Sequence, residues 1–118
     1  MDVTDQPEDY RARCLPHLLA LRMLARYTPE APLPWLAVAE VTQATDAILA
    51  EVEAAVRAVT GSGPGIGIFL GARLSRLAAA ADDAIAAAGA GDFTQLRTHL
   101  RRFDTLTSAI WAVQDASR

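Results

Sequence analysis

The chain has 118 residues and a mass of 12.6 kDa, enough for one domain with its own hydrophobic core. Hydrophobic residues make up 52% and charged residues 21%, which excludes the class of chains that are disordered through charge excess. The net charge is -3, and all the positive charge is arginine. Nucleic acid is therefore not expected as a partner, because sequence-independent binding of its phosphates needs a net basic surface.

We expect no signal for export or for membrane insertion in this chain. Its first residues are acidic and polar, whereas a secretory signal has a basic start and an apolar run. The longest uncharged stretch, 58–72, has 15 residues, fewer than the ~20 that a membrane-spanning helix needs. The single cysteine, Cys14, cannot form an internal disulfide. We therefore expect a cytoplasmic protein that does not enter a membrane.

The first predicted helix covers about residues 6–27. Asp5 and Glu8 have capping-box spacing at its start. Pro16 lies inside the segment and removes one helical hydrogen-bond donor, which predicts a kink near this residue. Thr28 precedes a proline and so avoids the helical conformation, which ends the helix.

The second predicted helix covers about residues 34–60 and has the most regular pattern in the chain. Pro34 suits the first turn, where no backbone N–H is needed. Gly61 then offers a left-handed exit. Apolar residues and one threonine recur at spacings of three and four: Val38, Val41, Thr45, Ile48, Val52, Ala55 and Val59.

The third and fourth predicted helices cover about residues 66–88 and 92–116. Asp92 and Gln95 form a second possible capping box, and the connector 89–91 is short. The two helices should therefore be antiparallel neighbours. Their buried rows are expected to be Leu70, Leu74, Leu77, Ala81, Ile85 and Ala88 in the third, and Leu96, Phe103, Leu106, Ile110 and Val113 in the fourth.

No segment alternates apolar and polar residues in the way a half-buried strand does. Four amphipathic helices joined by short loops predict an all-α fold. We expect residues 1–118 to form a single-domain antiparallel four-helix bundle with up-down-up-down topology.

The chain is alanine-rich, with 25 alanines, and these pose the main functional question. Glycines at every fourth position, continued by Ala79, remove side-chain bulk from one helix face and permit close approach of another helix. Alanines opposite the apolar row of the second helix leave a flat, weakly polar face. Internal packing and helix propensity explain both features without a partner. The functional interpretation is an interface built from Ala47, Ala50, Ala54, Gly63, Gly67, Gly71 and Ala79.

A second hypothesis concerns polar residues at mid-height of the bundle. Counting residues from the helix ends places five of them at about one level, where bundles can hold ligands or metals: Cys14, His17, Thr45, Asp82 and His99. The pairs of ligands typical of di-iron bundles are absent, so no metal site is assigned and no cofactor is expected. The alternative is that both histidines form ordinary hydrogen bonds at the edge of the core.

Arg97, Arg101 and Arg102 form the densest basic cluster. Ion pairs with Asp82 and Asp83 of the preceding helix are one interpretation, and a docking site for an acidic partner is the other. No set of residues suggests catalysis. We expect a non-enzymatic interaction or regulatory accessory module that self-associates, for example as a homodimer, or binds another protein. The alternative is a small-ligand or metal-binding bundle around His17 and His99.

Overall fold

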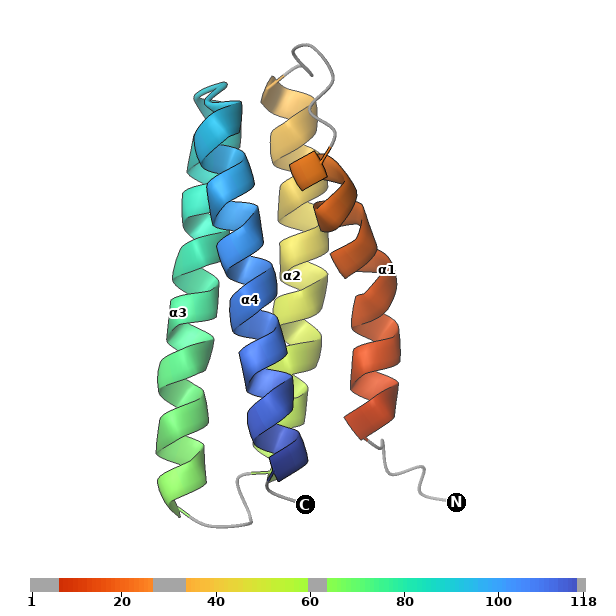
Figure 1. Ribbon diagram of the computed structural model, residues 1–118, viewed down its shortest axis with the longest axis vertical. Coiled ribbons are helices and arrows are strands. Elements are labelled where there is room, and N and C mark those ends of the chain that lie inside the picture. The colour runs from red at the N-terminus through yellow and green to blue at the C-terminus, as the bar shows by residue number, and fades with distance from the viewer. Residues whose placement is uncertain (1–6, 27–33, 60–63, 117–118) are drawn as a thin grey trace.

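The computed structural model describes residues 7–26, 34–59 and 64–116, which form four helices and contain no strand. The helices are α1 (Pro7–Arg26), α2 (Pro34–Val59), α3 (Pro64–Gly89) and α4 (Phe93–Ala116). They pack side by side as a four-helix bundle (Figure 1). Each bound differs from the expected one by two residues or fewer. None of these helices combines the length and the hydropathy needed to cross a bilayer.

Three of the four helices begin at a proline. Proline fixes a helical φ angle and lacks an N–H, a group that has no intrahelical partner in the first turn anyway. The third helix accordingly starts at Pro64, two residues before the expected start at Ile66. Pro16 differs because it lies inside α1, which is helical on both sides of it.

The helices form a ring in which α1 contacts α2 and α4, and α3 contacts the same two helices. In Figure 1, α1 begins and α4 ends at the same end of the bundle. The core is a single cluster to which every helix contributes residues at spacings of three and four. Its largest fully buried side chains are Phe103, Leu21, Ile48, Leu70, Leu77, Leu96, Leu100 and Ile110.

Many of the alanines lie in this core rather than on the surface. On α3 five alanines are buried: Ala80, Ala81, Ala84, Ala87 and Ala88. Small side chains permit close approach of neighbouring helices, so alanine here supplies internal packing. The described alanines are thus divided between the core and the surface in similar numbers.

Gly91, in the left-handed conformation, ends α3, and Asp92 caps the start of α4. The N–H of Gly91 donates to the carbonyl of Ala88, and the N–H of Asp92 donates to that of Ala87, the bonding pattern of a Schellman motif. Gly91 has a φ of 71°. The side chain of Asp92 then accepts a hydrogen bond of 3.1 Å from the Gln95 N–H, which confirms the capping bond predicted at this position. The Asp5–Glu8 capping box and the exit at Gly61 lie outside the described residues.

We predict that Gly91→Ala lowers the free energy of unfolding by about 1 kcal/mol, because an L side chain disfavours a left-handed conformation. The matched control is Gly89→Ala. Gly89 is helical, and a Cβ there would lie 3.6 Å from Val38, an ordinary contact. Urea unfolding should therefore show an unchanged or slightly higher stability for the control. Equal losses in the two variants would contradict this account.

Candidate functional site

A row of large apolar side chains on α1 faces solvent. Leu15, Leu19 and Met23 follow each other at spacings of four, which places them on one face of the helix. They are 49%, 48% and 62% exposed. Sequence analysis did not single them out. The available signal was that α1 is apolar on more than one side, which is typical of a helix covered on more than one side.

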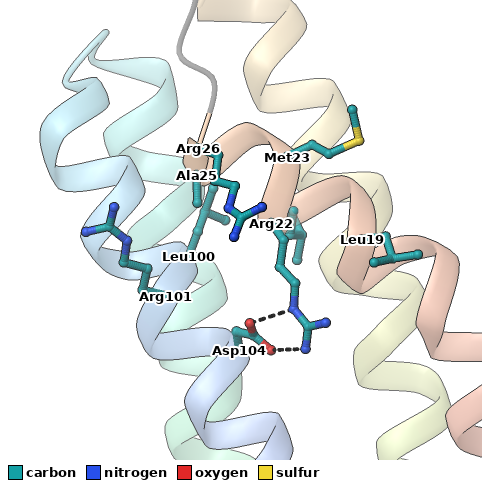
Figure 2. Close-up of a pocket in the computed structure, with 9 residues that line it drawn as sticks. Leu19, Arg22, Met23, Ala25, Arg26, Leu100, Arg101 and Asp104 are labelled. Atoms are coloured by element: carbon teal, nitrogen blue, oxygen red, sulfur yellow. Dashed lines mark hydrogen bonds and ion pairs between the residues drawn. The ribbon is translucent and has the colours of Figure 1, made fainter.

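This row borders a groove of about 520 Å³ between α1 and α4, shown in Figure 2. Apolar side chains make up much of its lining, and three arginines and one aspartate supply the charged groups. The lining residues are Leu19, Leu21, Arg22, Met23, Ala25, Arg26, Leu100, Arg101 and Asp104.

One ion pair crosses the α1–α4 groove. The Arg22 guanidinium donates from Nε to Oδ2 of Asp104 at 2.8 Å and from Nη2 to Oδ1 at 2.9 Å, a bidentate geometry (Figure 2). The hydrogen bonding to Asp104 raises the pKa of Arg22 above its ordinary value. The pair satisfies the one acidic side chain in the lining, so Asp104 does not neutralise the other two arginines.

A second groove, of about 550 Å³, lies between α1 and α2. Its polar groups are His17, Glu40 and Gln43, and the rest of the lining consists of Ala20, Met23, Leu24 and Ala44. Met23 lines both grooves, so the exposed apolar surface continues around the C-terminal half of α1.

The five residues of the expected polar layer are found in different environments. Cys14 and Thr45 are buried, His17 and His99 are half-buried, and Asp82 is exposed. The Thr45 hydroxyl donates to the carbonyl of Val41 in its own helix at 2.7 Å, which satisfies it locally.

His17 lines the α1–α2 groove, whereas neither groove includes Asp82 or His99. The Nδ1 atom of His99 is buried and has no hydrogen-bond partner among the described residues. Within the part of the chain that the structure describes, no three His, Cys, Asp or Glu side chains are grouped as metal ligands would be.

The expected interface residues are also unevenly exposed. Ala50 and Ala79 are exposed, and Ala47, Ala54 and Gly71 are half-buried. A Cβ built on Gly71 would meet no described atom within 4 Å, so this glycine is not explained by close packing against those residues. Gly63 lies outside the described residues. Gly67 belongs to α3, but its exposure is outside what the structure describes.

The Cys14 thiol is held in its neutral form. Burial, together with the nearby charge of Glu51, raises its pKa to about 11. Its Sγ lies 4.0 Å from the Ile48 carbonyl oxygen, which accepts from the thiol. A thiol in this environment is a packing group rather than a nucleophile.

Comparison of the chain with protein-family models, with curated proteins and with solved structures finds no match. A four-helix bundle by itself does not indicate a function, because unrelated proteins with different activities share this architecture.

We predict that Cys14 is alkylated by iodoacetamide at pH 8 at least about a hundredfold more slowly in the native protein than in urea. The reason is that burial raises the thiol pKa to about 11, which lowers the thiolate fraction at pH 8 about a hundredfold, and burial also slows access of the reagent. Mass spectrometry of quenched samples measures both rates. A native rate close to the unfolded rate would show that the thiol is accessible.

Proposed function

We propose that this chain is a non-enzymatic protein–protein interaction module with a regulatory or accessory role. The observation that carries the proposal is the exposed row of Leu15, Leu19 and Met23, continuous with two grooves on either side of α1. Contiguous apolar surface with a polar border is typical of a site where another protein binds. A single exposed apolar side chain would not support this inference, whereas three large ones on one helix face do.

The proposal includes self-association through the Ala- and Gly-containing surface of α2 and α3. Ala50 and Ala79 support it because both are exposed, and Gly71 supports it because a Cβ built there would meet no described side chain and no other helix within 4 Å. Surfaces of small side chains allow two helices to approach closely, which favours a second copy with the same surface.

The proposal also includes the antiparallel up-down-up-down connection of the helices. Two hydrogen-bonded pairs between α1 and α4 support it: Arg11 bonds to Trp111, and Arg22 bonds to Asp104. The residue numbers rise along α1 while they fall along α4, so the two helices run in opposite directions. A kink of α1 near Pro16 is supported by the missing proline N–H. A cytoplasmic location is supported by the single cysteine, which needs no oxidising compartment.

We predict that the chain is a dimer at micromolar concentration and that Ala50→Arg with Ala79→Arg weakens the dimer at least about tenfold. Two large charged side chains would prevent close approach of the paired surfaces. The matched control is Ala12→Arg with Ala112→Arg, since both alanines are exposed on the other two helices. Sedimentation equilibrium measures the dissociation constants. A monomeric wild-type chain would contradict the self-association part of the proposal.

A second candidate function is the binding of a small molecule in the α1–α2 groove. The observation that favours it is the combination of an apolar lining with His17 and Glu40, which suits an amine with an apolar body. His99 is not part of this site, and the described residues give no support to a bound metal.

For this candidate we predict that phenethylamine, as a probe amine, raises the unfolding temperature and that Glu40→Gln removes the shift. A bound amine stabilises the folded state in proportion to its occupancy, and removing the carboxylate removes its counter-charge. Differential scanning fluorimetry measures the shift, with Glu53→Gln as the control. No shift in the wild-type protein would exclude this candidate.

A further inference from the structure

We propose that the groove between α1 and α4 binds an acidic amphipathic helix of a partner protein. The inference deepens the proposed function and rests on it, because it specifies the partner of the same interaction module. Two properties of the groove carry it: an apolar surface about as long as a short helix, and an excess of positive charge at one end.

The apolar surface has the dimensions of a short helix. From Leu15 to Met23, the apolar row on α1 rises about 12 Å at ~1.5 Å per residue, which is about two turns. Leu19 and Met23 line the groove and are also exposed beyond it, and Leu15 extends the same row. An apolar helix face laid into the groove would cover the row.

The charge at one end of the groove favours an acidic partner. Arg22 is paired with Asp104 across the groove. Near this pair lie Arg26, one turn further along α1, and Arg101, almost one turn back along α4. Figure 2 shows the Arg26 guanidinium between the two helices, above the pair. No described acidic side chain forms an ion pair with Arg26 or Arg101.

The lining therefore has three arginines and one aspartate, a local excess of two positive charges on a chain whose net charge is -3. Charge complementarity of this kind selects partners and accelerates their association. The expected partner helix presents apolar residues at i, i+4 and i+7 to the α1 row, with Asp or Glu on the same face at the end that meets Arg26 and Arg101.

The test uses a designed helical peptide of about 15 residues with capped termini. It carries leucines at i, i+4 and i+7 and two glutamates in one terminal turn of the same face, and a control peptide has glutamine in place of both glutamates. In titrations of ¹⁵N-labelled full chain, the acidic peptide should shift amide signals of residues 15–26 and 100–104. At about 50 mM salt it should bind about tenfold more tightly than the neutral peptide, and this advantage should shrink at about 500 mM.

Two pairs of variants test the residues of the groove. Arg26→Gln with Arg101→Gln should weaken binding of the acidic peptide about five- to tenfold, as expected for two partly screened charges. Arg57→Gln with Arg76→Gln makes the same change in net charge on α2 and α3 and should leave binding within about twofold. Met23→Gln should also weaken binding, whereas Ile68→Gln, a control at an exposed apolar residue of α3, should not.

Several outcomes would overturn the inference. They are the absence of peptide binding up to about 1 mM, equal binding of the neutral peptide, and equal effects of the two arginine pairs.

If decanoate shifts the same signals while the peptide does not, the groove takes a small amphiphile. If Met23→Gln abolishes self-association, a second copy covers the groove. Failure of the peptide with an intact Ala50/Ala79 dimer would refute this inference alone, whereas a monomer that binds no peptide would refute the proposed function too.

Discussion

The exposed apolar surface of this protein follows from which side chains of α1 are buried in the common core and which are left outside it. Each helix in a bundle buries the residues at spacings of three and four that face its two neighbours. On α1 the buried positions are Cys14, Leu18, Leu21 and Ala25, two of which have small side chains. The apolar side chains of Leu15, Leu19 and Met23 fall outside this buried face and are about half exposed or more. The grooves beside α1 and the apolar row follow from this division.

Buried alanines allow the other helices of the bundle to pack closely. The buried alanines of α3 belong to the same core cluster as the large side chains of Phe103 and Ile110. Small residues near large ones let helix axes approach while the space between them stays filled. The two buried threonines of this core are satisfied within their own helices. The hydroxyls of Thr45 and Thr107 each donate to a carbonyl four residues earlier.

Charged side chains connect α1 to its neighbours along its length. Arg13 pairs with Glu51 of α2, and Arg22 pairs with Asp104 of α4. At the other end of α1, the Arg11 guanidinium donates to the Trp111 carbonyl oxygen at 2.9 Å and lies 5.4 Å from the Trp111 ring centroid. Both ion pairs are partly exposed, so they add little to the burial of Leu18 and Leu21 in keeping α1 on the bundle. Arg26 and Arg101, which line the groove, form no ion pair with a described residue.

The sequence by itself determined the helices, because their signals are local. Prolines suit first turns, Gly91 suits a left-handed turn, and Asp92 caps a helix, so the bounds depend on a few neighbouring residues. The buried row of α2 could also be predicted from the sequence. Its residues Val41, Thr45, Ile48, Val52 and Ala55 recur with helical spacing, and all are buried.

Only the tertiary structure decided which side of α1 and which alanines are covered. In α1 apolar residues occur around most of the helix, so periodicity does not choose between Leu18 and Leu19. The alanines of α3 are ambiguous for the same reason, because alanine suits a core and a surface equally. Counting residues along helices estimated heights but not rotation about each helix axis. It therefore grouped His17 with His99, although the structure places only His17 in the α1–α2 groove.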